Sequence, residues 1–130
     1  MHLAHLTLAT RDVDKTAQFF EATLGCARKP LPANSVGGAV WFDIGNGQEM
    51  HVLYVETFEI TPFEAEFGRH VAVFYPRAGF AELKRRLAAE GATLIDPIRA
   101  TSFERFFFRE PVNGYVFEVI DQDRASHLDQ

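Results

Sequence analysis

Four residues of types that bind metal ions occur in the chain as two pairs with almost the same spacing. His51 follows His5 by 46 residues (51 minus 5), and Glu118 follows His70 by 48 residues (118 minus 70). Imidazole nitrogens and carboxylate oxygens are common protein ligands of divalent metals. If the two halves of the chain fold alike, a pseudo-twofold axis would bring all four side chains around one point. The spacing therefore predicts a metal site.

The first half of the chain predicts one strand, one helix and then a hairpin. Asp12 is a suitable N-cap for the helix, and Gly25 is expected to end it. The segment Gly45-Asn46-Gly47 is typical of a tight hairpin turn. Alternating or continuous apolar residues predict the strands at residues 3–9, 39–44 and 49–55.

The second half predicts the same order of elements. A helical stripe of Phe80, Leu83 and Leu87 ends at Gly91, although this helix lacks a good cap. Residues 111–114 predict the turn of the last hairpin. Strands are expected at residues 69–74, 92–98, 105–109 and 115–120.

The hairpin glycines place the two halves in register. Gly47 lies four residues before His51, and Gly114 lies four residues before Glu118. We therefore interpret the chain as a single domain made from two copies of one module. The expected ranges are about 1–55 for module one, 56–67 for a linker and 68–122 for module two, followed by a short C-terminal tail.

The residues around these pairs resemble the vicinal oxygen chelate superfamily of glyoxalases, extradiol dioxygenases, fosfomycin-resistance enzymes and bleomycin-binding proteins. The resemblance runs over roughly residues 3–121 and rests on the opening segment 5–13, on His70 and on the closing segment 111–118. It implies an α+β fold of two βαβββ modules, each a curled mixed sheet enclosing half of a metal-binding cavity. The ligands would lie on the first and last strands of each module, at His5, His51, His70 and Glu118.

The resemblance also implies a divalent cation that chelates two neighbouring oxygens of a substrate. The ion could be Zn, Ni, Mn, Co or Fe(II), acting as a Lewis acid. We favour a glyoxalase-, lyase- or epimerase-like reaction in which Glu118 is the catalytic residue that moves a proton. The alternatives are an extradiol-type dioxygenase and a metal-free protein that sequesters small molecules, as in bleomycin resistance.

Among the four candidate ligands, His51 is the one for which the sequence offers the most alternatives. Glyoxalases usually carry Glu or Gln at this place, which argues against a lactoylglutathione reaction. A site of His5, His70 and Glu118 alone would already have open positions for substrate. Glu49 shares a strand face with His51 and could replace it, although the hairpin alignment favours His51.

The last hairpin predicts a substrate-binding surface beside Glu118. If residues 110–115 close the turn, Glu118 pairs with Phe107, and Arg105, Phe107 and Arg109 share its face. Such a face could hold an anionic or aromatic small molecule. The alternative is that both arginines form salt bridges at the rim.

Composition limits the classes of partner. A formal net charge of -5 without a basic stripe argues against nucleic acid. No segment approaches the ~20 apolar residues of a membrane span, and without a visible secretory signal we expect a cytoplasmic protein. The lone Cys26 allows neither an intrachain disulfide nor a Cys-based zinc site. The resemblance implies a homodimer, with each site inside one chain or shared between two.

Overall fold

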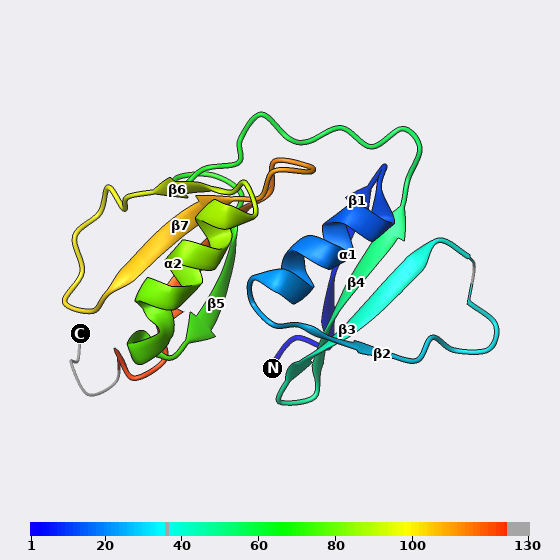
Figure 1. The fold of residues 1–130 in the computed structure, drawn as a ribbon, viewed down its shortest axis with the longest axis horizontal. Coiled ribbons are helices and arrows are strands. Elements are labelled where there is room, and N and C mark those ends of the chain that lie inside the picture. Colours follow the sequence, from blue (N-terminus) through cyan, green and yellow to red (C-terminus); the bar gives the residue numbers. More distant parts are fainter. Residues whose placement is uncertain (36, 125–130) are drawn as a thin grey trace. The chain divides into compact units, whose positions relative to one another are not determined.

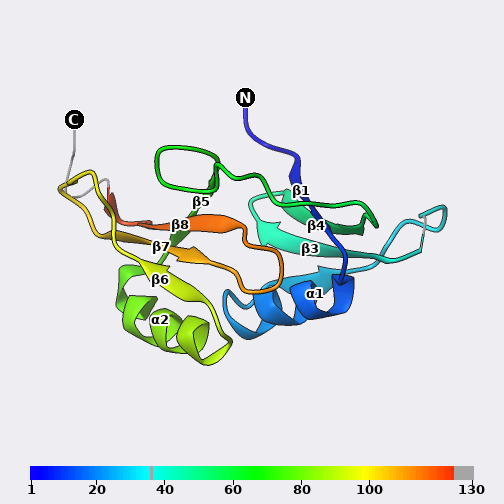
Figure 2. The same cartoon turned by 90° about the horizontal axis from the view of Figure 1, so that it is seen from above.

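The computed structural model describes residues 1–35 and 37–124, which form parts of two compact units, Met1–Glu59 and Ile60–Gln130 (Figure 1). Each unit consists of a four-stranded mixed sheet with a helix covering one face (Figure 2). Among the described residues, no helix is long and apolar enough to cross a membrane.

The first unit has the element order βαβββ. Its sheet order is β1-β4-β3-β2, in which β1 and β4 run parallel and the other neighbours antiparallel. The elements are β1 (His5–Thr10), α1 (Val13–Ala22), β2 (Ala27–Lys29), β3 (Ala39–Gly45) and β4 (Gln48–Tyr54).

The second unit repeats this topology. Its sheet order is β5-β8-β7-β6, again with one parallel pair, β5 and β8. The elements are β5 (Val71–Tyr75), the 3-10 turn η1 (Arg77–Gly79), α2 (Phe80–Ala89), β6 (Thr93–Ile95), β7 (Arg105–Arg109) and β8 (Val116–Asp121). The predicted α+β fold of two βαβββ modules is confirmed.

Local signals explain where the helices and turns form. The Asp12 carboxylate accepts a hydrogen bond from the Lys15 amide at 3.0 Å and caps α1, as predicted. Gly79 provides no side-chain cap for α2, also as predicted. Asn46 and Gly47 have φ values of +54° and +74°, which is the left-handed pair that a two-residue hairpin turn requires.

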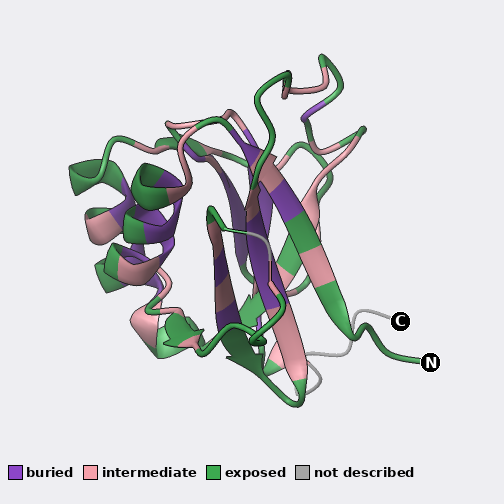
Figure 3. Ribbon diagram, turned by 90° about the vertical axis from the view of Figure 1, so that its right-hand side faces the viewer, coloured by how far each residue is buried: buried purple, intermediate pink, exposed green. Residues whose placement is uncertain are grey.

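Each sheet has a buried helix face and a second face that carries polar side chains. Figure 3 shows buried segments on the side of the helical ribbons that faces the strands. In the second unit, Phe80 of α2 contacts Phe106 of β7 edge to face, with ring centroids 5.3 Å apart. Burial of each such ring stabilises the fold by ~1.5–3 kcal/mol. Because side chains alternate along a strand, Phe107 and Glu118 point to the other face.

The structure corrects several predicted boundaries. Helix α1 ends at Ala22 rather than at Gly25, and His70 lies one residue before β5 instead of within it. The short strand β2 was not predicted. Residues 92–98 form only the three-residue β6, and beyond its end the amides of Ile98 and Arg99 donate to the carboxylate of Glu66.

The predicted linker is partly integrated into the second unit. Residues 60–67 belong to that unit, and Glu64 is almost fully buried there. Its carboxylate accepts hydrogen bonds from the Val116 amide at 2.8 Å and from Arg69 at 3.0 Å. This segment therefore helps to build the module that contains His70 and Glu118.

Candidate metal centre

The strand registers place the two candidate pairs at equivalent positions of their modules. In the first module Thr7 pairs with His51, and His5 lies two residues before Thr7. In the second module Ala72 pairs with Glu118, and His70 lies two residues before Ala72. The nearly equal sequence intervals therefore correspond to the same diagonal relationship across a parallel strand pair.

In the second module the two candidate ligands converge. The Nε2 atom of His70 lies 3.2 Å from Oε1 of Glu118, and the two side chains are 22% and 9% exposed. The other ring nitrogen, Nδ1, lies 3.1 Å from the carbonyl oxygen of Ala65. Because a carbonyl can only accept, Nδ1 carries the proton. In the neutral ring, Nε2 is then the unprotonated nitrogen, which is the form a metal ion binds.

This arrangement fits a cation between the two side chains. A bare Nε2 facing a carboxylate oxygen at 3.2 Å brings two lone pairs together, so either a proton or a cation must lie between them. The carbonyl that fixes the tautomer is the kind of outer partner that metal-binding histidines usually have. The donor types and their geometry in this half fit a divalent metal.

Glu118 has a second partner on its other oxygen. Arg105 donates from Nη1 to Oε2 of Glu118 at 2.9 Å and from Nη2 to Oε2 of Glu66 at 3.0 Å. Arg105 also donates to the carbonyl of Arg99. The Arg105 side chain is only 3% exposed, and its Nε has no hydrogen-bond partner among the described residues. Arg105 is thus held inside the module by two carboxylates.

The charge of Glu66 is stabilised by its surroundings. Burial by itself raises the pKa of this carboxyl, but hydrogen bonds from the Ile98 and Arg99 amides and from Arg105 outweigh burial and lower the pKa to about 2. The same ion pairs hold the pKa of Arg105 above its usual value, against the opposing effect of burial. Both groups are therefore ionised at neutral pH.

The other two predicted substrate contacts also have partners within the module. Phe107 pairs with Glu118 as predicted, is 1% exposed, and lies edge-on to the His70 ring with centroids 5.3 Å apart. Arg109 donates to the carbonyls of Gly114 and Glu64 at 3.0 and 3.2 Å. Arg105 forms its salt bridges inside the module, and Arg109 donates to backbone carbonyls there. A substrate role for Arg105, Phe107 and Arg109 stays a prediction.

In the first module His51 lies within a stack of three rings. Its centroid is 3.8 Å from that of Trp41, with planes 4° apart, and 4.1 Å from that of His5, with planes 16° apart. His51 Nε2 lies 2.9 Å from Oε1 of Glu49. Since a carboxylate accepts, Nε2 carries the proton and Nδ1 is the unprotonated nitrogen of the neutral ring. Stacking and this hydrogen bond fix the His51 ring.

The carboxylate of Glu49, which was considered as a replacement for His51, contacts the His51 ring directly. Glu49 also accepts from the ammonium of Lys29. Hydrogen bonds from His51 and Lys29 hold the pKa of the Glu49 carboxyl below its usual value. In this structure Glu49 has the position of an outer partner that orients His51.

The four predicted ligands occur as two pairs, one in each module. Among residues 1–35 and 37–124, no group of three or more His, Cys, Asp or Glu side chains has a metal-binding arrangement. The four-residue centre stays a prediction.

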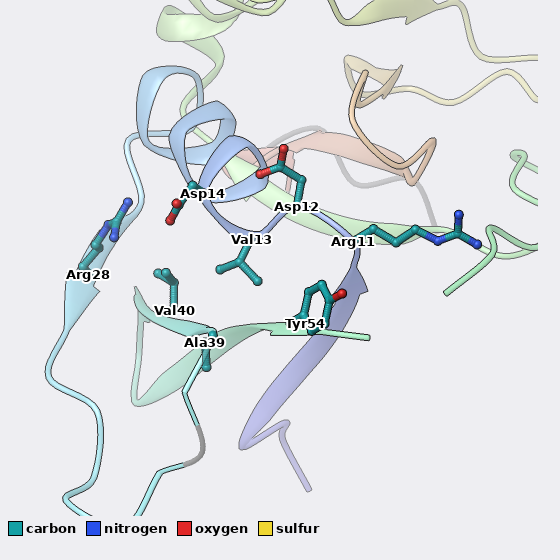
Figure 4. Close-up of a pocket in the computed structure, with 9 residues that line it drawn as sticks. Arg11, Asp12, Val13, Asp14, Arg28, Ala39, Val40 and Tyr54 are labelled. Atoms are coloured by element: carbon teal, nitrogen blue, oxygen red, sulfur yellow. The ribbon is translucent and has the colours of Figure 1, made fainter. Parts of the chain in front are cut away.

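A separate cavity of about 420 Å³ lies in the first module, outside the predicted site (Figure 4). None of the four candidate ligands lines it. Arg28 at its wall is paired with Glu21 through two hydrogen bonds of 2.9 Å. The lining residues are Arg11, Asp12, Val13, Asp14, Arg28, Gly38, Ala39, Val40 and Tyr54.

Sequence reasoning missed Trp41, Lys29 and Glu66. Trp41 is the only tryptophan and pairs with His51 in the strand register, a relationship that the hairpin turn could have revealed. Glu66 lies in the segment interpreted as a linker. The available signal was two arginines on the inner face of a predicted strand, since buried cations require acidic partners.

The comparisons with known proteins agree with this architecture. The chain is similar to a mutant of FosX from Listeria monocytogenes complexed with Mn(II) and 1S,2S-dihydroxypropylphosphonic acid, with a TM-score of 0.78 and 17% identity over 99% of this chain and 98% of that one. FosX from Mesorhizobium loti has a TM-score of 0.70 and 16% identity, with coverage of 96% and 95%. A Bacillus anthracis protein described as glyoxalase family has a TM-score of 0.74 and 22% identity, with coverage of 93% and 94%.

These likenesses, at low identity, show a shared fold. No curated protein sequence matches the chain significantly. The model of one protein family matches residues 2–119, which is nearly the whole chain. The chain therefore belongs to the Glyoxalase/Bleomycin resistance protein/Dioxygenase superfamily.

Proposed function

We propose that the protein is a metal-dependent enzyme whose His5, His51, His70 and Glu118 hold a divalent cation for a small-molecule substrate with two neighbouring oxygens. The observation that carries this proposal is the His70–Glu118 pair. Ala65 fixes the proton on Nδ1, so in the neutral ring the unprotonated Nε2 faces a carboxylate oxygen at 3.2 Å. The equivalent strand position of His5 and His51 supports the same role for the first module.

A bound cation would supply Lewis acidity that polarises the substrate oxygens. Within the chain, Glu118 is the candidate to accept and return a proton, because its Oε1 faces His70 while its Oε2 is held by Arg105. The buried Phe107 ring beside His70 keeps water from this side of the pair. A proton-transfer reaction of glyoxalase or epimerase type fits these roles.

One comparison supports the choice of metal and substrate class. The FosX structure from Listeria monocytogenes holds Mn(II) together with a molecule that carries hydroxyls on adjacent carbons. Mn(II) is therefore the first ion to test here. The substrate class we propose is a small molecule with vicinal oxygens, one of them a carbonyl, such as a 2-hydroxy ketone or the hemithioacetal of a 2-oxoaldehyde.

The experiment uses Mn(II)-loaded protein in D₂O with a panel of such compounds, followed by proton NMR. We expect deuterium to enter at the carbon next to a chelated oxygen, and Glu118→Gln to reduce the rate by about 10²–10⁴-fold. His2→Gln, which changes an exposed terminal histidine, is the control.

Two outcomes would contradict this proposal. One is an exchange rate that Glu118→Gln leaves unchanged. The other is no exchange with any compound, combined with oxygen consumption when Fe(II)-loaded protein receives catechols. The second outcome would instead favour the dioxygenase alternative.

A further inference from the structure

Arg105 bridges two carboxylates that lie far apart in the sequence. One of its terminal nitrogens donates to Glu118 at 2.9 Å and the other to Glu66 at 3.0 Å, with the side chain 3% exposed. Glu66 comes from the segment before β5, and Glu118 from the last strand. The guanidinium of Arg105 is therefore a buried cation in direct contact with Glu118, a candidate metal ligand.

The contact with Arg105 fixes how Glu118 presents its oxygens. Because Oε2 is held by a charged hydrogen bond, Oε1 is the atom left facing His70. A carboxylate held in this orientation loses little rotational freedom when an ion binds. Outer partners of this kind typically change metal affinity 10–100-fold when they are removed.

A buried guanidinium close to a cation site creates a problem of charge. Without compensation, the positive charge of Arg105 would repel an incoming divalent ion. Glu66 supplies the compensation, because its carboxylate binds the same guanidinium and is itself held by the amides of Ile98 and Arg99. The Arg105–Glu66 pair is neutral, so the full charge of Glu118 stays available to a metal.

We infer that Arg105 and Glu66 are positioning residues: Arg105 orients Glu118 toward the ion, and Glu66 neutralises Arg105 so that this orientation does not repel the ion. The inference rests on the proposed function, since it concerns the same site. It differs from a substrate-binding role for Arg105, because both terminal nitrogens are occupied by partners in the module and the side chain is buried.

The test measures Mn(II) affinity by calorimetry in three variants. Glu66→Gln should weaken binding about 10–100-fold, because it leaves the charge of Arg105 uncompensated. Arg105→Met should weaken binding about tenfold through the lost orientation of Glu118. In the double variant, Glu66→Gln should add less than about a twofold loss to Arg105→Met, since Glu66 acts through Arg105.

A fourth variant and a matched pair serve as controls. Arg105→Lys should not restore wild-type affinity, because one ammonium cannot reproduce the planar fork between two carboxylates. Glu104→Gln and Arg77→Met change an exposed pair 4.0 Å apart in the same module and should leave affinity unchanged. Melting curves in EDTA show which variants are folded at the temperature of the titration.

The outcomes separate this inference from the proposed function. If Glu66→Gln weakens binding by the same factor with and without Arg105, or by less than about threefold, the positioning role is wrong while the metal site stands. If the wild-type protein binds no divalent ion, both fail. If Glu66→Gln does not fold, Arg105→Met decides the orienting role of Arg105, and a loss of less than about threefold in that variant would contradict it.

Discussion

His70 faces Glu118 with the ring nitrogen that carries no proton in the neutral tautomer. The separation of Nε2 and Oε1 is 3.2 Å, and the carbonyl of Ala65 accepts from Nδ1 at 3.1 Å. In His51 the proton is on the other ring nitrogen, because Nε2 donates to Glu49 at 2.9 Å. Each module thus fixes the tautomer of one histidine, and the two modules use different acceptors to do so.

Trp41 is expected to report metal binding by the first module. Its ring is stacked on His51 at 3.8 Å, and it is the only tryptophan in the chain. If His51 binds the ion, Ni(II) should quench the fluorescence in a saturable way. Because we propose one ion for all four ligands, Glu118→Gln should shift the midpoint at least about tenfold to higher Ni(II). Titrating the wild type and Glu118→Gln with Ni(II) and recording tryptophan fluorescence measures this shift of the midpoint.

His51→Ala is the companion variant for that titration. It should abolish the saturable quenching, whereas His2→Ala should keep it. A wild-type response that persists in His51→Ala would mean that His51 is not a ligand. The smaller set of His5, His70 and Glu118 would then be favoured.

The sequence predicted the topology because its signals are local. Asp12 caps a helix through its own neighbours, and the turn glycines Gly47 and Gly114 adopt positive φ wherever the hairpin closes. Counting from those glycines placed His51 and Glu118 at matching strand positions. Such features depend on a few consecutive residues and can therefore be predicted from the sequence.

The supporting residues could not be predicted in the same way. Glu66 contacts Arg105 across 39 residues of sequence, and nothing in residues 56–67 distinguishes this glutamate from a solvated one. The three-residue strand β2 carries no periodic pattern, and the amides of Ile98 and Arg99, which were predicted to continue or follow a strand, donate to the same Glu66 carboxylate. These features arise from tertiary contacts, which override local propensity.

The ion pair of Glu66 predicts a pH dependence of stability. Against the opposing effect of burial, hydrogen bonds from the Ile98 and Arg99 amides and from Arg105 lower the pKa of this carboxyl from its ordinary value of 4.5 to about 2. Its contribution is therefore fully present above about pH 4.5 and is lost as the pH falls toward about 2. The difference in unfolding free energy between wild type and Glu66→Gln should shrink over this range. Urea denaturation at a series of pH values measures it, and a difference independent of pH would contradict the ion pair.

Glu110 is expected to stabilise the last hairpin. This fully buried carboxylate accepts hydrogen bonds from the amides of Val112 and Asn113 at 2.7 and 2.9 Å. Glu110→Ala should lower the unfolding free energy by about 3 kcal/mol, since charged hydrogen bonds to a buried group are lost. Glu104→Ala, at an exposed position, should change it by less than about 0.5 kcal/mol. A loss below about 1 kcal/mol in Glu110→Ala would contradict the structural role.

Cys26 is expected to be unreactive in the folded protein. Burial raises the pKa of its thiol to about 11, so little thiolate is present at neutral pH. Iodoacetamide at about pH 7.5 should modify the native protein at least tenfold more slowly than the protein unfolded in urea. Mass spectrometry over time measures both rates. Equal rates would show that the thiol is accessible and ionised.

The central claim is that the chain holds a divalent metal through residues of both modules. The most direct measurement is metal content and calorimetry after EDTA treatment and reloading with Mn(II), Zn, Ni or Fe(II). The account predicts about one ion per chain, with uptake abolished in His70→Ala and in Glu118→Ala and retained in His2→Ala. A content near zero with all four ions, or normal uptake by either of the first two variants, would contradict it.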